Sequence, residues 1–92
     1  MGYHLDIRRV EPQIRVLPDS VRAALAEVLA VIAEDPWPGK SLLNILPLKD
    51  GDENREFTVP FDGGRGLLAY RILPLVDYRY IRFIGLWWAG TP

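Results

Sequence analysis

The run REFTVPFDGGRGLLAYRIL, at residues 55–73, decides the fold of this chain. Apolar side chains alternate with less apolar ones over residues 57–61, which is typical of a strand with one apolar face. The Gly63-Gly64 pair then tolerates the positive φ angles that tight hairpin turns need. Residues 66–73 predict a second strand that is apolar on both faces. Such a strand is expected at the centre of a sheet, covered on both sides or nearly so.

A third strand is predicted at residues 78–88, so that three consecutive strands form a β-meander. Side chains on a strand alternate between the two faces of the sheet. Strict alternation places Ile81, Phe83 and Trp87 on one face. It also places Trp87 and Trp88 on opposite faces, with one of them in the core and the other exposed near the chain end.

The N-terminal half predicts one short strand and two helices. Residues 3–8 alternate weakly between apolar and polar side chains, which is typical of a short strand. A short helical turn begins at Glu11-Pro12, because proline suits the first position of a helix. A longer helix is predicted from Pro18 to Glu34, where apolar residues recur on one face. Two prolines that follow cannot donate backbone hydrogen bonds and end this helix.

Together these elements predict an α+β fold in a single domain spanning residues 1–92. The expected architecture has a short N-terminal strand and a helical hairpin, which packs on one face of an antiparallel β-meander. A domain of this size buries little more than about 60% of the surface of its unfolded chain. Its hydrophobic core is therefore expected to be thin.

Composition excludes several classes of function. The chain has no cysteine and a single histidine, His4, so neither a thiolate nor a multi-histidine metal site is possible. The Asp50-Gly51-Asp52 run lacks the ligand spacing of a calcium-binding EF-hand loop, and no metal or cofactor is expected. The N-terminus lacks the apolar region of a secretory signal, and no segment approaches the ~20 apolar residues that cross a bilayer. A cytoplasmic protein without a membrane partner is expected.

The charges are few but unevenly placed. The net charge of −1 argues against non-specific binding of DNA. Residues 55–92 nevertheless carry five arginines against three acidic residues, a balance of +2. A guanidinium binds carboxylate or phosphate through two hydrogen bonds, so these arginines either contact an anionic partner or form surface ion pairs. They are Arg55, Arg65, Arg71, Arg79 and Arg82.

The order of elements and three motifs resemble the RelE/ParE toxin superfamily. The motifs are EDPWP at residues 34–38, REF at 55–57 and GRGLLAYRI at 64–72. The run FDGGRGLLAY, at residues 61–70, is similar to an actinobacterial group of these proteins. The resemblance implies a type II toxin–antitoxin system, in which an antitoxin peptide covers the groove of the toxin. It also implies one of two activities, since RelE-type members cleave mRNA in the ribosomal A site and ParE-type members inhibit DNA gyrase.

The resemblance also implies which residues would carry the nuclease activity. RelE-type nucleases use lysines and arginines across the meander, together with a C-terminal tyrosine or histidine. Arg65, Arg71 and Arg82 are therefore the candidate catalytic residues of a metal-independent endoribonuclease. Residues 57–59 and 87–90 of this chain stand where the nucleases carry lysines and the C-terminal tyrosine or histidine. These differences favour binding over cleavage.

Three functions remain as alternatives. The first is a toxin-like component that acts by protein binding, with a cognate antitoxin as partner and a target such as gyrase. The second is a ribosome-dependent mRNA endoribonuclease of RelE type. The third is a degenerate member of the superfamily without toxicity. For the first alternative, the candidate partner-binding residues are Arg55, Arg65, Arg71, Arg82 and Trp88.

Overall fold

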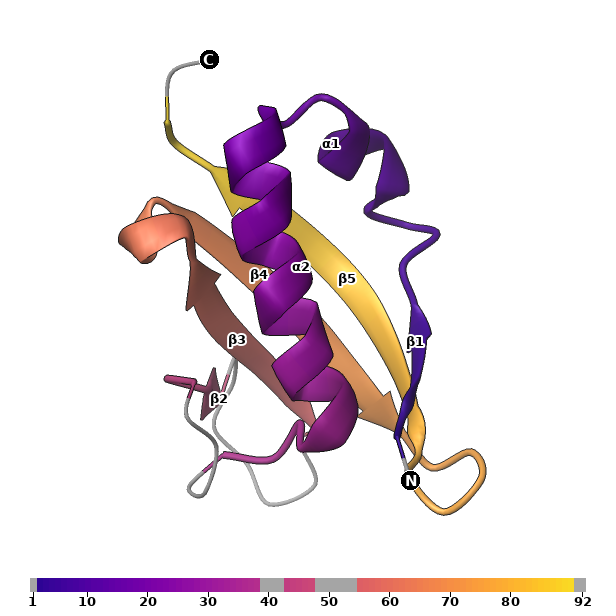
Figure 1. Cartoon of the computed structure of the whole chain (residues 1–92). Helices are drawn as coiled ribbons and strands as arrows, with labels where there is room; N and C mark the ends of the chain where they lie inside the picture. The colour runs from indigo at the N-terminus through magenta and orange to yellow at the C-terminus, as the bar shows by residue number, and fades with distance from the viewer. Residues whose placement is uncertain (1, 39–42, 48–54, 91–92) are drawn as a thin grey trace.

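The computed structural model describes residues 2–38, 43–47 and 55–90. Its strands form one sheet in the order β1-β5-β4-β3-β2, and the long helix α2 lies across one face of it (Figure 1). The predicted α+β fold, with a meander of three antiparallel strands, is confirmed. The Asp50-Gly51-Asp52 run lies outside the described residues. The elements are β1 (His4–Asp6), α1 (Glu11–Arg15), α2 (Asp19–Glu34), β2 (Leu46–Pro47), β3 (Glu56–Phe61), the 3-10 turn η1 (Asp62–Gly64), β4 (Gly66–Leu73) and β5 (Tyr80–Trp88).

Two short edge strands flank the meander. β1 pairs with β5 in parallel and places residues 4–6 opposite residues 80–82. β2 pairs with β3 in antiparallel fashion through Leu46 and Pro47. The sequence does not predict this strand, because a proline has no backbone N–H to donate to a ladder and interrupts regular elements. Proline is tolerated here because β2 is an edge strand, whose outer side makes no ladder hydrogen bonds.

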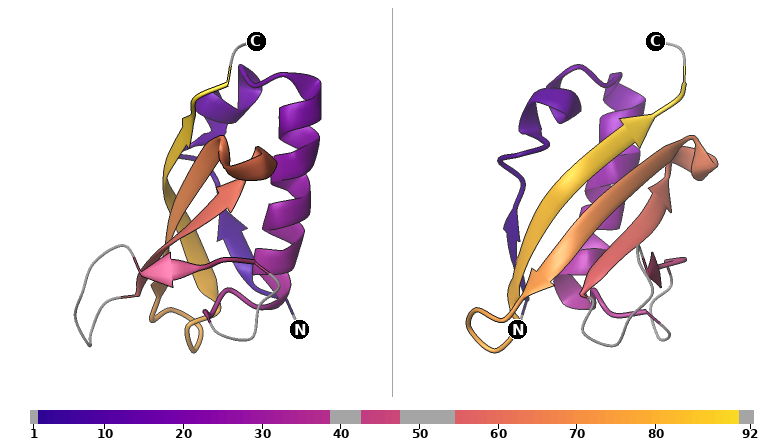
Figure 2. Two further views of the ribbon diagram at one scale, coloured as in Figure 1. Left: turned by 90° about the vertical axis from the view of Figure 1, so that its left-hand side faces the viewer. Right: turned by 180° about the vertical axis from the view of Figure 1, so that it is seen from behind.

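Helix α2 supplies one side of the hydrophobic core, and the sheet supplies the other (Figure 2, left). The buried Tyr70 hydroxyl donates a hydrogen bond of 2.6 Å to the carbonyl of Pro36, which joins the end of α2 to β4. Burial raises the pKa of Tyr70 above its ordinary value. Neither α2 nor any other helix of the described chain is long and apolar enough to span a membrane. The buried helix residues, spaced three or four apart, are Val21, Leu25, Val28 and Ile32.

The turn between β3 and β4 depends on its two glycines, as the sequence predicts. Gly63 and Gly64 have φ angles of 64° and 90°. L-residues with a Cβ rarely adopt these left-handed angles, whereas glycine adopts them readily. The chain can therefore reverse within η1 and bring Gly66 opposite Phe61 in the antiparallel ladder.

A β-bulge shifts the alternation of side chains between the two faces along β5. Tyr70 pairs with Phe83 but the preceding Ala69 pairs with Gly85, so β5 carries one additional residue at this point. Beyond the bulge every side chain points to the opposite face from the one that strict alternation predicts. The prediction that Trp87 shares a face with Ile81 and Phe83 is therefore wrong: Trp87 is 56% exposed, whereas Ile81 and Phe83 are fully buried.

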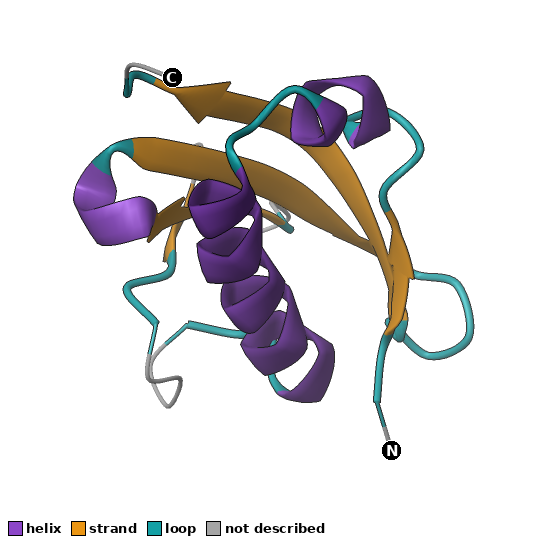
Figure 3. Ribbon diagram, turned by 45° about the horizontal axis from the view of Figure 1, so that its top comes forward, coloured by secondary structure: helices purple, strands orange, loops and turns teal. Residues whose placement is uncertain are grey.

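Only one face of β4 is covered by a helix. Leu67 is 39% exposed and Arg71 is also exposed, although both belong to the central strand of the meander. The prediction of a strand covered on both sides is wrong in this respect. The apolar side chains on both faces predict two covering layers, but the helices of the described chain pack on one face, where α2 lies across the sheet (Figure 3). Seen from behind, β4 and β5 lie in front of the helix, with no described helix or strand over them (Figure 2, right).

Candidate functional site on the open face of the sheet

The face of the sheet opposite α2, here called the open face, carries a row of charged residues. Residues that lie opposite one another in paired strands point to the same face. The strand registers therefore align two arginines between two acidic residues, across four strands. Both arginines are exposed to solvent. From β1 to β3 the row, here called the charged row, is Asp6, Arg82, Arg71 and Glu56.

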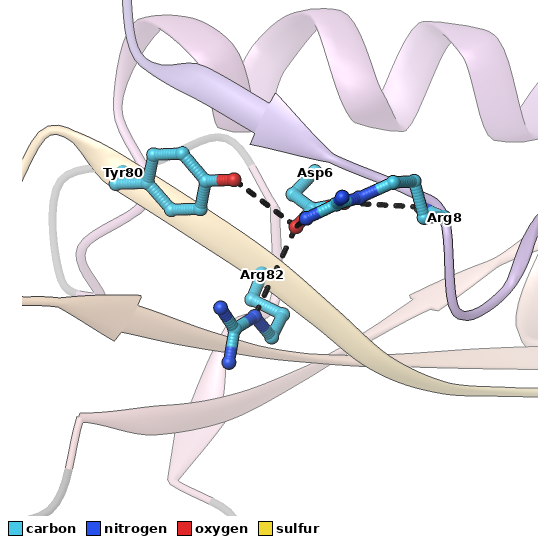
Figure 4. Close-up of polar contacts among 4 residues, drawn as sticks. All are labelled: Asp6, Arg8, Tyr80 and Arg82. Atoms are coloured by element: carbon cyan, nitrogen blue, oxygen red, sulfur yellow. Dashed lines mark hydrogen bonds and ion pairs between the residues drawn. The ribbon is translucent and has the colours of Figure 1, made fainter.

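Asp6 is the buried end of the charged row. Its carboxylate accepts hydrogen bonds from Nε and Nη2 of Arg8, at 3.0 and 2.9 Å, and from the Arg8 backbone N–H at 3.2 Å. The Tyr80 hydroxyl donates a further bond of 3.1 Å, and Nε of Arg82 lies 3.9 Å from the same carboxylate oxygen (Figure 4). The Arg8 hydrogen bonds hold the pKa of Asp6 well below its ordinary value. Asp6 is therefore ionised at neutral pH.

Apolar side chains occupy the other end of the open face. Trp87 pairs in register with Leu67, and both are exposed. The Trp87 ring lies over Gly85, since a Cβ added to Gly85 would come within 2.6 Å of it. A larger residue at position 85 would therefore displace the ring. The result is an exposed indole on the same face of the sheet as Arg71 and Arg82.

Arg65 lies at the far end of β4 from the charged row. Its guanidinium pairs with Asp62 of the turn at 2.9 Å, and the same carboxylate accepts a 2.8 Å hydrogen bond from the Trp88 indole. The Trp88 bond lowers the pKa of Asp62. Arg71 lies six residues further along the chain, which is ~20 Å on a strand. Of the three candidate catalytic arginines, Arg71 and Arg82 are therefore adjacent and Arg65 is remote from both.

Arg55 and Trp88, both predicted to bind a partner, make contacts within the fold. The Arg55 guanidinium lies 5.9 Å from the centroid of the Trp37 ring and 5.6 Å from that of Tyr78. These are cation–π distances. Trp88 is half-buried and packs against the hydrophobic core. The more exposed tryptophan is Trp87, and partner contacts by Arg55 and Trp88 stay predictions.

The sequence did not single out Asp6, Glu56 or Trp87 as site residues. Asp6 enters the charged row because β1 pairs with β5, and its hydrogen-bond donor Tyr80 is 74 residues away in the sequence. The nearby Arg8 was a local signal for an ion pair. Glu56 could have been found by aligning the two strands of the predicted hairpin, but Trp87 could not, because its exposure depends on the bulge.

The open face combines groups that bind anions and aromatic or apolar surfaces. Arg71 and Arg82 are neighbouring guanidinium groups on paired strands, and Glu56 adds a carboxylate that can accept a proton. His4 lies one row away, with its ring centroid 4.7 Å from that of Tyr80. Within residues 2–38, 43–47 and 55–90, no three His, Cys, Asp or Glu side chains are grouped to hold a metal ion.

A solved structure shares this fold over its whole length. The structure is similar to that of a protein chain in the crystal structure of the archaeal RelE–RelB complex from Pyrococcus horikoshii OT3, with a TM-score of 0.70 and 16% sequence identity. The match covers 100% of both chains. No protein-family model and no curated protein matches the sequence. The RelE/ParE-like fold that the sequence predicts is confirmed.

Proposed function

We propose that this chain, which has the RelE/ParE-like fold, is the toxin-like component of a type II toxin–antitoxin pair and acts by binding proteins through its open face. The observation that carries this proposal is an exposed Trp87 on the same face of the sheet as Arg71 and Arg82, a face that no helix of the described chain covers. Tryptophan and arginine are the residue types that most often dominate binding energy at protein interfaces. The full-length likeness to a chain of a RelE–RelB complex supports the same role.

The partner that fits this face is a cognate antitoxin segment with acidic and apolar side chains. Its acids would pair with Arg71 and Arg82, because the guanidinium fork matches the geometry of a carboxylate. Its apolar side chains would pack on Trp87 and Leu67. An antitoxin and a target such as gyrase are both cytoplasmic, and we place the chain there.

Coexpression with the product of the neighbouring reading frame tests this function. Induction of the chain alone is expected to arrest growth, and the neighbour is expected to copurify with it and relieve the arrest. Trp87→Ala and Arg71→Ala should each weaken capture of the neighbour at least tenfold, as for interface hot spots. Arg22→Ala is the matched control, since Arg22 is an exposed arginine on α2. Equal capture by all three variants would exclude the open face as the interface.

A second candidate function is a metal-independent endoribonuclease that cleaves mRNA on the ribosome, and the charged row favours it. Glu56 lies opposite Arg71, which in turn lies opposite Arg82. Glu56 would take the proton of a ribose 2′-hydroxyl, and the two arginines would neutralise the phosphate in the transition state. The 2′-oxygen would form a cyclic phosphate while the 5′-oxygen leaves with a proton from solvent.

Mapping of mRNA ends after induced expression separates the alternatives. Cut mRNA that disappears in Glu56→Gln, by at least a hundredfold, would support the nuclease. Growth arrest with intact mRNA would support protein binding. Normal growth together with no captured neighbour would support the third alternative, a degenerate family member without toxicity.

A further inference from the structure

The edge of the sheet at β1 carries an open pocket of about 390 Å³, lined by Asp6, Arg8, Arg9 and Arg82. Ligand pockets in proteins span ~300–1,000 Å³, so this one is small. The four lining residues carry three guanidinium groups and one carboxylate, a formal charge of +2. A pocket lined by charged side chains with a positive excess suits a small anion better than an apolar ligand.

Asp6 orients two of the three arginines. Its two carboxylate oxygens accept from Nε and Nη2 of Arg8, and Nε of Arg82 faces it at 3.9 Å. The terminal nitrogens of Arg82 point away from the carboxylate (Figure 4). The Asp6 side chain is 6% exposed, whereas that of Arg8 is 81% exposed. The carboxylate therefore lies behind the cations and holds them in place, and their remaining N–H groups face solvent.

The sheet itself places a fourth arginine, Arg71, beside this pocket. Arg82 lies directly opposite Arg71 in the β4–β5 ladder. Like charges at opposed positions destabilise a sheet. Asp6 already accepts two side-chain hydrogen bonds from Arg8, so it offsets only part of the charge of Arg82. Glu56 lies opposite Arg71 on its other side and offsets part of the charge of Arg71. An anion bound to Arg82 would reduce the remaining repulsion between the two arginines.

We propose that this pocket binds a small oxyanion of the phosphate class, such as inorganic phosphate or the phosphate group of a free mononucleotide. Arg8, Arg9 and Arg82 donate hydrogen bonds to the phosphate oxygens, and Asp6 is a positioning residue. Phosphate fits better than a carboxylate because it offers more acceptor oxygens and up to two negative charges to the guanidinium groups. The site shares Arg82 with the proposed protein interface, but it does not rest on that function.

Calorimetric titration of the full chain at low salt tests the proposal with inorganic phosphate, AMP and adenosine as probes. Wild type is expected to bind phosphate and AMP but not adenosine. Equal affinity for phosphate and AMP would assign recognition to the phosphate group alone, and AMP binding at least tenfold tighter would identify a nucleotide as the ligand. Binding of neither anion, or equal binding of adenosine and AMP, would overturn the proposal. Capture of an antitoxin is measured separately, so the two proposals can fail independently.

Matched arginine variants locate the site. Arg82→Gln and Arg9→Gln are each expected to weaken phosphate binding about tenfold, which is typical for loss of a charge-assisted hydrogen bond. Arg22→Gln removes the same charge from an exposed arginine of α2 that also pairs with an aspartate, and is expected to change the affinity less than twofold. An equal loss in Arg22→Gln and Arg82→Gln would show that only the overall charge matters, and would overturn the site.

Asp6→Asn separates orientation from charge. This variant makes the chain more positive by one unit, so long-range attraction alone predicts tighter binding of phosphate. If Asp6 positions Arg8 and Arg82, binding should instead become about tenfold weaker, because the arginines lose their anchor. Circular dichroism of each variant confirms that it is folded. Tighter binding in folded Asp6→Asn would refute the positioning role.

Discussion

Two aspartates, one in strand β1 and one in the turn η1, make the same kinds of contact in different surroundings. Each carboxylate is buried or nearly so, and each has a lowered pKa. Each accepts hydrogen bonds from an arginine that follows it closely in the sequence and from an aromatic side chain of β5. The two groups, here called the Asp6 cluster and the Asp62 cluster, are Asp6 with Arg8 and Tyr80, and Asp62 with Arg65 and Trp88.

The two clusters differ in the balance of charge. At Asp62 the described contacts pair one carboxylate with one guanidinium, and the cluster closes the turn between β3 and β4. At Asp6 the pairing of β1 with β5 brings in Arg82, and Arg9 joins the same pocket. An aspartate–arginine pair thus fixes local backbone where the charges balance. The same pair becomes part of a binding surface where cations are in excess.

The largest expected effect is on stability at the Asp62 cluster. Trp88→Ala should lower the free energy of unfolding by about 3 kcal/mol, because it removes packing against the core as well as the bond to Asp62. Trp87→Ala should cost less than about 1 kcal/mol, since this side chain is exposed. Urea unfolding of both variants measures the difference. A larger loss in Trp87→Ala would contradict the position of the bulge in β5.

Acid should weaken the fold through both clusters, and more strongly through Asp6. A carboxyl group whose pKa is lower in the folded state than in the unfolded state stabilises the fold at pH values above the unfolded pKa. That unfolded pKa is 3.8 for both residues. This stabilisation is lost as the pH falls below about 4 towards the folded pKa. Asp6→Asn should flatten the decline of unfolding free energy between pH 5 and pH 2 more than Asp62→Asn, because Asp6 accepts more hydrogen bonds. Parallel declines in wild type and Asp6→Asn would contradict this.

The smallest expected effect separates the two aromatic donors. Trp88→Phe and Tyr80→Phe each remove one hydrogen bond to an aspartate and keep an aromatic ring. Trp88→Phe should raise the pKa of Asp62 more than Tyr80→Phe raises that of Asp6. The reason is that the indole bond is the main cause of the shift at Asp62, whereas Arg8 is the main cause at Asp6. Titration of the carboxyl carbons by NMR measures both values, and the reverse order would show that Tyr80 is the principal donor.

Local signals in the sequence located most of the elements. The predicted central strand at residues 66–73 coincides with β4, and the predicted helix end at Glu34 coincides with the end of α2. The extent of β4 and the end of α2 both depend on the backbone preferences of residues nearby in the sequence. The prolines end α2, and the glycines of η1 allow the turn before β4. The sequence does not predict strand β2, because Pro47 disfavours a strand locally. The pairing of β2 with β3 outweighs that local preference.

The sequence by itself determined the α+β fold, the strand order of the meander and the excess of arginine in its second half. These features depend on alternation, turn chemistry and composition, which are properties of contiguous residues. Only the tertiary structure decided which residues form the site. The β1–β5 pairing brings Asp6 to Arg82, and the bulge turns Trp87 outwards. Both depend on hydrogen-bond register between strands, and that register is set when the whole sheet packs against α2.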